Sequence, residues 1–431
     1  MSKKKPLVNV LQNLALVVLA ASAIYLLTQT PLFSGRWSDP LQALLTPRSP
    51  AAGQSQSAGL SPIIPSFHVM ITGDKAYGRF GRLHMAHDDP DFQDVPPLLR
   101  DALGSAVMVG RTAELTMWDA LDTPSIYLDL TTELPLTVIA AWLETETAID
   151  QSARYIALTT EDESAVMLYL VDGEGSIFRY ATALPVSNVQ ALAEKILPNG
   201  SVFAYESNYA SLSPYAILAS SASTPPELTA ALPAGYSTDA LLTALDFNAY
   251  TKSRYYESSG TEVVVESPRT LHVSPSGTVV YSGEEEAVPS LYTVSCAGDA
   301  PTAAEALRCA SSLAAALTEG AGASPLYLRS LQVTEAGYQI TFGYQPEGYA
   351  LFFTGSHQSL EDGDALSVTI TGRTITAFAY RCRLYTATEQ DSLLEPPTQA
   401  VAIASIYSGS GLSIGYVDNG SGTLSACWLA G

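Results

Sequence analysis

The chain of 431 residues is 47% hydrophobic and only 15% charged, and its 43 acidic side chains outweigh 21 basic ones. Such an apolar fraction, with 23 tyrosines, excludes wholesale disorder, and the length predicts two or three domains. The formal charge of −22 argues against nucleic acid as a partner, since phosphate binding needs clustered lysine and arginine. Three of the six lysines are Lys3, Lys4 and Lys5, which concentrates basic charge at the N-terminus.

A mainly apolar run without charge, from Leu7 to Leu27, follows these lysines. As a helix it is long enough to cross the roughly 30 Å hydrocarbon core of a bilayer. Because the lysine-rich side of a span stays in the cytoplasm, we predict a cytoplasmic tail over 1–6 and a transmembrane anchor over 7–28. The protein would then be a single-pass protein of the cell membrane, with the bulk of its chain extracytoplasmic. A cleaved signal peptide is the alternative, because Ala21-Ser22-Ala23 resembles a cleavage site.

One face of the predicted helix carries amide and small side chains at three- and four-residue steps. It consists of Asn9, Asn13, Leu16, Ala20 and Ala23. Lateral helix packing in lipid uses such side chains for hydrogen bonds and close backbone approach, so this face is a candidate for helix interaction. The alternative is that the amides are hydrated in the headgroup region.

Beyond the anchor, the composition predicts a flexible linker over 29–65 that is rich in Ser, Pro, Gly and Gln. An N-terminal α+β domain is predicted over 66–200. Its strands are expected over 66–71, 125–130, 165–171 and 176–180, and its helices from 98 onward, over 114–121 and over 135–143.

A central α+β domain is predicted over 201–290 and a C-terminal α+β domain over 291–431. The central domain is expected to contain a helix over 239–247 and strands over 262–266, 271–274 and 278–281. The C-terminal domain is expected to contain helices over 301–317 and 398–405 and strands over 328–333, 338–344, 350–353, 365–370, 374–384, 414–417 and 425–429. In both, a helix precedes antiparallel strands, which suggests two related units. The predicted fold class is α+β, with antiparallel sheets and packed helices outside the membrane.

Four cysteines, Cys296, Cys309, Cys382 and Cys427, lie in the last third of the chain. An oxidising compartment permits two bridges, with Cys296–Cys309 and Cys382–Cys427 as one of three pairings. Free buried thiols are the alternative. The chain has no Cys-x-x-Cys pair, so zinc-ribbon and thioredoxin-type sites lose their main support.

Motifs for catalysis are weak throughout. His84-Met85-Ala86-His87 with Asp88 and Asp89 is metal-like, but a catalytic zinc usually needs a third, distant ligand, so a surface loop is the simpler interpretation. Gly411-Leu412-Ser413-Ile414-Gly415 matches the Gly-x-Ser-x-Gly elbow, yet it leads into a predicted strand and no histidine follows it. His68, His272 and His357 are isolated and are expected to be packing or surface residues. We therefore predict no enzyme activity, no catalytic residue, no metal site and no cofactor.

Several segments, spread over nearly the whole chain, follow a recurring order of aromatic and turn residues. They are Tyr25–Phe33, Trp118–Leu121 with Ile126–Leu128 and Leu134-Pro135, Arg254–Glu257 with Gly260-Thr261, Leu271–Tyr281, and Leu394–Ala400 through Gly415–Val417 to Trp428. In these segments the chain resembles the YycH/YycI-type regulators, and its length favours the longer, YycH-like member.

The resemblance implies a non-enzymatic, membrane-anchored regulator of a WalK/YycG-like two-component sensor histidine kinase in a Gram-positive cell wall pathway. It implies contacts with the kinase and with a YycI-like partner through the membrane helix and the outer domains, and a YycI-like C-terminal domain. A homodimer is compatible with it. The alternative function is an extracytoplasmic ligand- or cell-wall-binding module tethered to the membrane, which a polar pocket in the later domains would support. A membrane-tethered hydrolase is a third hypothesis and would need convergent catalytic groups.

Overall fold

The computed structural model describes residues 63–73, 78–86, 89–207, 212–218, 224–248, 250, 253–284, 289–354, 360–404 and 412–430. All of these residues belong to one compact unit. The predicted anchor over 7–28 and its face of Asn9, Asn13, Leu16, Ala20 and Ala23 lie outside these ranges. Among the helices that the structure describes, none combines the length and the apolar character that a membrane span requires.

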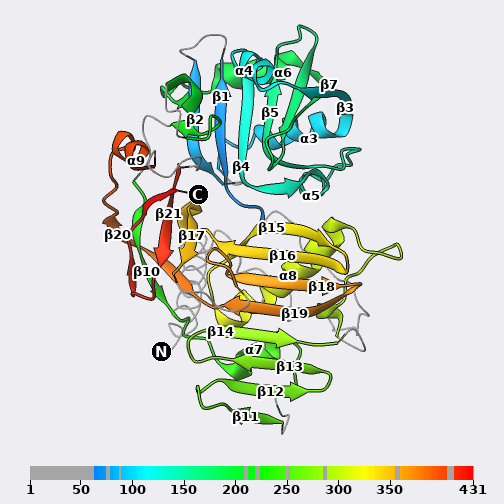
Figure 1. Ribbon diagram of the computed structural model, residues 1–431, viewed down its shortest axis with the longest axis vertical. Coiled ribbons are helices and arrows are strands. Elements are labelled where there is room, and N and C mark those ends of the chain that lie inside the picture. Colours follow the sequence, from blue (N-terminus) through cyan, green and yellow to red (C-terminus); the bar gives the residue numbers. More distant parts are fainter. Residues whose placement is uncertain are drawn as a thin grey trace, which may run out of the picture. The chain divides into compact units, whose positions relative to one another are not determined.

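The first part of the chain folds into a seven-stranded antiparallel sheet with strand order β2-β1-β4-β5-β6-β7-β3 (Figure 1). Its strands are β1 (Phe67–Thr72), β2 (Arg79–Met85), β3 (Val107–Thr112), β4 (Ser125–Pro135), β5 (Ser152–Thr159), β6 (Ala165–Val171) and β7 (Ile177–Pro185). Consecutive strands from β4 to β7 are neighbours. Short hairpin connections join β5 to β6 and β6 to β7, whereas helix α5 lies between β4 and β5 in the chain.

Both faces of this sheet are covered. Three helices, α3 (Val95–Ser105), α5 (Leu136–Trp142) and α6 (Val186–Lys195), share a buried cluster with side chains such as Leu128 and Ile156. On the other face α4 (Glu114–Leu121) and the short pair β8 (Val202–Phe203) and β9 (Ile217–Leu218) pack around Tyr127 and Tyr169. Burial on both sides explains why the central strands are apolar at nearly every position. We call this sheet with its helices the N-terminal body.

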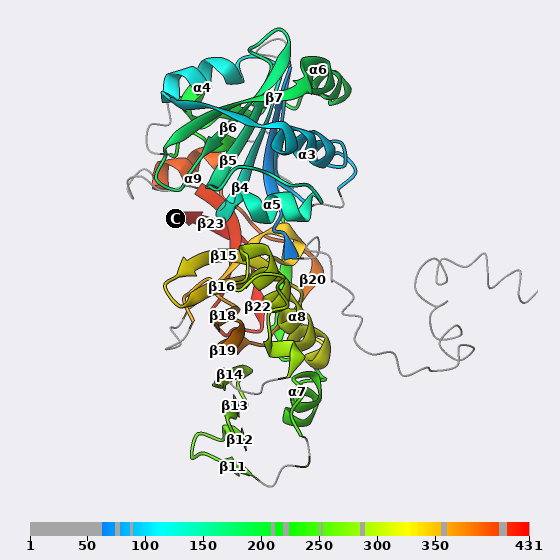
Figure 2. The ribbon, with the colours of Figure 1, turned by 90° about the vertical axis from the view of Figure 1, so that its right-hand side faces the viewer.

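The second large sheet has eight antiparallel strands in the order β11-β12-β13-β14-β19-β18-β16-β15. Its strands are β11 (Arg254–Tyr256), β12 (Glu262–Glu266), β13 (Arg269–Val273), β14 (Thr278–Ser282), β15 (Leu326–Thr334), β16 (Gly337–Tyr344), β18 (Leu366–Thr371) and β19 (Thr374–Arg381). Helices α7 (Thr238–Ala244) and α8 (Ala303–Ala321) pack together on one side of it (Figure 2).

This sheet consists of two four-stranded halves, each preceded by one helix. Helix α7 precedes β11 to β14, helix α8 precedes the other four strands, and the halves join where β14 pairs with β19. The helix-then-strands order expected for both later regions is therefore present. The sheet combines strands from the predicted central (201–290) and C-terminal (291–431) regions.

Two smaller sheets complete the structure. One has the order β20-β10-β22, formed by β10 (Pro226–Ala231), β20 (Leu384–Asp391) and β22 (Thr423–Leu424). The other has the order β17-β21-β23, formed by β17 (Ala350–Phe353), β21 (Leu412–Asp418) and β23 (Cys427–Ala430). A last helix, α9 (Pro397–Ala404), precedes β21. We call residues 224–430 of the described ranges the C-terminal body.

The α+β class is confirmed for the described residues, with three corrections of detail. The β17–β21 pair is parallel, so the sheets are not all antiparallel. The strand predicted over 374–384 ends at Arg381, and the chain enters another sheet at Leu384. The break is stabilised by Gly277 and Tyr344, which accept hydrogen bonds from the amides of Cys382 and Arg383. Finally, Ile63 and Ile64, within the predicted linker, are buried in the core.

Candidate functional site

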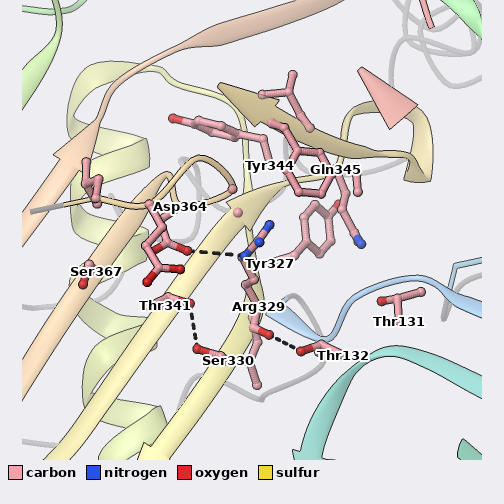
Figure 3. A pocket seen from close by; sticks show the side chains of 18 of the residues that line it. Thr131, Thr132, Tyr327, Arg329, Ser330, Thr341, Tyr344, Gln345, Asp364 and Ser367 are labelled. Atoms are coloured by element: carbon pink, nitrogen blue, oxygen red, sulfur yellow. Dashed lines mark hydrogen bonds and ion pairs between the residues drawn. The ribbon is translucent and has the colours of Figure 1, made fainter. Parts of the chain in front are cut away.

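A cavity of about 780 Å³ lies beside β15, β16 and β18 of the C-terminal body, where residues of β4 and β5 of the N-terminal body also reach it (Figure 3). Its volume falls in the range of small-molecule sites, which is roughly 300–1,000 Å³. Most of its lining side chains carry hydroxyl, amide or charged groups. A site of this composition is suited to a polar ligand.

The floor of the cavity is a polar face of the eight-stranded sheet. The strand register places Ser330 opposite Thr341, and Thr341 opposite Ser367, so the three form one cross-strand row. A second row consists of Gln332, Gln339 and Thr369. The alternate residues of the same strands point to the other face and pack with α8. Among them are Ile340, Phe342 and Val368.

Hydrogen bonds fix the side chains of both rows. The hydroxyls of Ser330 and Thr341 are 2.9 Å apart. Gln339 donates from Nε2 to Ser367 Oγ at 2.6 Å and accepts at Oε1 from Thr369 Oγ1 at 2.9 Å. Because both ends of this amide are engaged, its orientation is determined before any ligand arrives.

Arg329 enters the cavity because of a β-bulge. The register shifts between Leu328, which faces the core, and Ser330, which faces the cavity, so that Arg329 is the extra residue and has no cross-strand partner. Bulges of this kind redirect a side chain and often lie beside functional sites. The carbonyl of Arg329 accepts a hydrogen bond from Thr132 Oγ1 of the N-terminal body.

The guanidinium of Arg329 is held on three sides. Its Nε lies 3.4 Å from Asp364 Oδ1, and its Cζ lies 5.0 Å from the ring centroid of Phe352. A Cβ atom on Gly363 would come within 1.6 Å of Nη1, so only glycine lets the guanidinium lie against the backbone there. Burial raises the pKa of Asp364, and the positive charge of Arg329 opposes that rise.

The opposite wall is formed by Thr131, Thr132 and Arg154 of the N-terminal body. Behind this wall, the carboxylate of the buried Asp129 accepts a hydrogen bond from Arg154 Nε at 3.0 Å. The same carboxylate lies 3.4 Å from His68 Nδ1. Burial alone would raise the pKa of Asp129, but the hydrogen bond from His68 and the charge of Arg154 outweigh it and lower the pKa to about 2.

Asp129 also supports an unusual backbone conformation. Thr131 has a φ of 62°, which is rare for a β-branched residue, and its N–H donates to Asp129 Oδ1 at 2.8 Å. Strained residues of this kind cluster at binding sites, where the surrounding structure holds them in place. A smaller cavity of about 120 Å³ shares Thr131 and Arg154 with the first and is also lined by His68 and Ser413.

The metal-like segment does not form a site in the described residues. His84 lies in strand β2, where helical i, i+3 spacing does not apply, and its ring packs on Tyr349 at a centroid distance of 4.3 Å. His87 and Asp88 lie outside the described residues. No group of three or more His, Cys, Asp and Glu side chains suitable for a metal is found in the part of the chain that the structure describes.

Ser413 lies within β21, and Gly411 is outside the described ranges, so the elbow geometry of a strand, a serine and then a helix does not occur.

All four cysteines are free thiols, so the structure contains neither Cys296–Cys309 nor Cys382–Cys427 as a bridge. Cys296 Sγ instead faces the carbonyl of Gly298 at 3.4 Å. Burial raises the pKa of the Cys309 and Cys382 thiols to about 11, which makes them poor nucleophiles.

The cavity residues were not predicted as a site, although the sequence carries one signal for them. In 326–334 and 337–344, hydroxyl and amide side chains recur at every second position, which indicates a strand with one polar face. His68 was expected to be an isolated packing residue, and only the fold brings it to Asp129.

The described residues therefore define a class: an α+β protein of several sheets with a polar, structurally prepared cavity between two bodies. No protein-family model and no curated protein sequence matches the chain. Its fold is similar to the crystal structure of YycH from Bacillus subtilis, with a TM-score of 0.51 and 10% sequence identity. The match covers 86% of this chain and 95% of that chain. The chain has a YycH-like fold.

Proposed function

We propose that this protein is a non-enzymatic, membrane-anchored regulator that modulates a cell-wall-linked two-component sensor histidine kinase. The observation that carries the proposal is the fold similarity to YycH over 86% of the chain. The order of sequence segments that resembles the YycH/YycI-type regulators supports it independently. In this proposal the predicted helix over 7–28 and the extracytoplasmic bodies contact the kinase, together with a YycI-like partner.

Regulation by association needs two states of the kinase that the protein binds unequally. A partner shifts an equilibrium only by its difference in affinity for the two states. The outer bodies offer a large surface for such discrimination, and the anchor face of Asn9, Asn13, Leu16, Ala20 and Ala23 offers small and amide side chains for helix contact.

The test is crosslinking of the intact protein in cells, followed by identification of its neighbours. We expect a sensor histidine kinase to be recovered, and replacement of Asn13 and Ala20 by Leu to reduce its recovery at least several-fold. The matched control replaces Ala15 and Ser22 by Leu, on the opposite side of the predicted helix, and should leave recovery unchanged. If the crosslinked neighbours include no sensor kinase, the proposal is contradicted. If the kinase is recovered equally with all variants, only the role of the helix face in binding is contradicted.

The second candidate function is an extracytoplasmic ligand-binding module on a membrane tether. The cavity of about 780 Å³ favours it, because its hydroxyl, amide and guanidinium groups are held in place by other residues. The two functions are compatible, since a ligand that contacts both bodies could change how the protein meets its partner.

A further inference from the structure

We propose that the cavity beside β15, β16 and β18 binds an uncharged, hydroxyl-rich ligand of the oligosaccharide class. The proposal goes beyond kinase regulation, because the ligand could bind whether or not the protein contacts a kinase. It rests on the charge balance of the lining, on the arrangement of hydrogen-bonding groups and on the fixed guanidinium of Arg329.

The charges of the lining balance. Its two cationic side chains are Arg154 and Arg329, and its two acidic side chains are Glu361 and Asp364. Each arginine is already paired, Arg154 with Asp129 and Arg329 with Asp364. In a chain of net charge −22, such a cavity gives a phosphate or sulfate ligand little electrostatic attraction. A neutral ligand fits the charge balance better.

The hydrogen-bonding groups suit hydroxyls. A sugar hydroxyl both donates and accepts, so its site needs donors and acceptors side by side. The lining offers the hydroxyls of Ser330, Thr341 and Ser367 next to the amides of Gln332 and Gln339. Amides and hydroxyls provide both kinds of group, and the two rows repeat them across neighbouring strands.

The planar groups suit adjacent hydroxyls. Arg329 presents a planar fork of N–H donors, which lies beside the Phe352 ring and the Gly363 backbone. Asp364 lies directly beside it and provides acceptors. Neighbouring ring hydroxyls can bridge such a pair. Tyr327 and Phe352 also line the cavity, and aromatic rings can pack against the apolar face of a sugar ring.

The experiment measures binding by calorimetry with the purified full-length protein, kept free of detergents that carry sugar headgroups. The probes are chitotriose and maltotriose as neutral saccharides, and a heparin tetrasaccharide as a sulfated one. We expect at least one neutral probe to bind with a dissociation constant below about 1 mM. The sulfated probe is expected to bind more weakly.

Two nearly isosteric substitutions test the rows, and one tests the guanidinium. Gln339→Leu and Thr341→Val should each weaken binding about tenfold or more, because each leaves a ligand hydroxyl without a partner. Gly363→Ala keeps every charge but displaces Arg329, so it should weaken binding by a similar factor. Gln390→Leu, on the exposed strand β20, is the matched control and should bind as the natural chain does.

Thermal unfolding checks that each variant is folded, and Ser367→Ala replaces any that is not, since it removes one hydroxyl without adding bulk. The proposal is overturned if neither neutral saccharide binds, if only the sulfated probe binds, or if Gln339→Leu and Gln390→Leu have the same affinity. Because no kinase is present, a failure here leaves the crosslinking result untouched, and a failure of crosslinking leaves saccharide binding untouched.

Discussion

Asp129 shows how one residue can organise a wall of the cavity. Its carboxylate is buried and is shared between His68, Arg154 and the backbone N–H of Thr131. When one partner of such a buried ion pair is removed, the remaining charge is buried without an opposite charge. The resulting loss of stability exceeds the net stabilisation that the pair provides. The carboxylate therefore couples strands β1, β4 and β5 at the edge of the cavity.

We predict that Asp129→Asn lowers the free energy of unfolding at pH 7 by about 2 kcal/mol. The pKa of Asp129 is lowered to about 2 in the folded protein, below its unfolded value of about 3.9. A lowered acid pKa gives stability that is present above pH 4 and is lost as the pH falls toward 2. Urea unfolding at pH 7 and at low pH measures the difference.

The matched control for this prediction is Asp299→Asn, at an exposed aspartate. It should leave the unfolding free energy unchanged at either pH. If Asp129→Asn and the natural protein are equally stable at pH 7, the contacts of the Asp129 carboxylate with its neighbours do not stabilise the folded protein.

Residue-level roles were the least predictable part of the site. Asp129 and Arg154 come from different strands, and sequence gives no pairing between them. The bulge that redirects Arg329 depends on one extra residue in β15 relative to β16, and no residue pattern in the local sequence indicates it. By contrast, the polar alternation that follows Arg329, at Ser330, Gln332 and Thr334, is visible in the sequence. The polar face could therefore be predicted, while the entry of Arg329 into the cavity could not.

Helix α8 illustrates an element whose beginning and end are encoded locally. Thr302 Oγ1 accepts from the Glu305 backbone N–H at 3.3 Å, and Glu305 Oε2 accepts from the Thr302 N–H at 2.8 Å. This capping box satisfies two amides that the first turn leaves without partners. Gly322 follows the last helical residue and caps the helix, with a φ of 71° in the left-handed conformation that glycine adopts freely.

We predict that Thr302→Ala lowers the free energy of unfolding by about 1 kcal/mol, because it removes the side-chain cap of a helix that covers one half of the sheet. Thr302→Ser keeps the hydroxyl and should retain most of that stability. Urea unfolding of the three proteins provides the measurement. If the Ala and Ser variants are equally stable, the cap does not stabilise the helix.

Among the elements, those with strong local patterns were predicted well. The helix over 114–121 and the strands over 165–171, 262–266 and 350–353 have the same bounds in the structure. The single strand predicted over 374–384 joins β19 to the start of β20, because the sequence shows no break where the backbone turns from one sheet to the other. Such a turn depends on tertiary hydrogen bonds, including the one from the Cys382 amide to Gly277.

At the scale of the whole molecule, the N-terminal and C-terminal bodies share buried apolar packing, with α5 against α8 and β4 near β15, and specific side-chain contacts add to it. His84 of β2 packs on Tyr349, and the Ser66 N–H donates to Gln345 Oε1 at 3.0 Å. Gly348, with a φ of 83°, allows the close approach, since a Cβ there would lie 2.6 Å from the His84 ring. These contacts lie near both cavities.

Protonation of His84 should weaken this junction. Burial lowers the pKa of His84 to about 4, with smaller contributions from His68 and Arg82, while Asp89 opposes the shift. The unfolded chain takes up this proton near pH 6.5, so stability is lost as the pH falls from about 6.5 toward 4. We predict that His84 accounts for a loss of about 2 to 3 kcal/mol over this window.

His84→Phe keeps an aromatic ring against Tyr349 but cannot titrate. Its unfolding free energy should depend less on pH between 6.5 and 4 than that of the natural protein. His272→Gln, at a half-exposed histidine, is the control and should keep the natural dependence. An unchanged pH profile in His84→Phe would refute a role for this histidine.

The seam between the two halves of the eight-stranded sheet bears on the order in which the chain folds. Within each half, paired strands follow one another closely in sequence, with only β17 inserted between β16 and β18, whereas the seam pairs Val280 with Ala379. About a hundred residues separate these partners, so closing the seam carries a larger loop-closure entropy than closing any hairpin beside it. A chain in which both halves have formed and the seam has not exposes the edges of β14 and β19. Open strand edges of this kind are where strand exchange between molecules and aggregation begin.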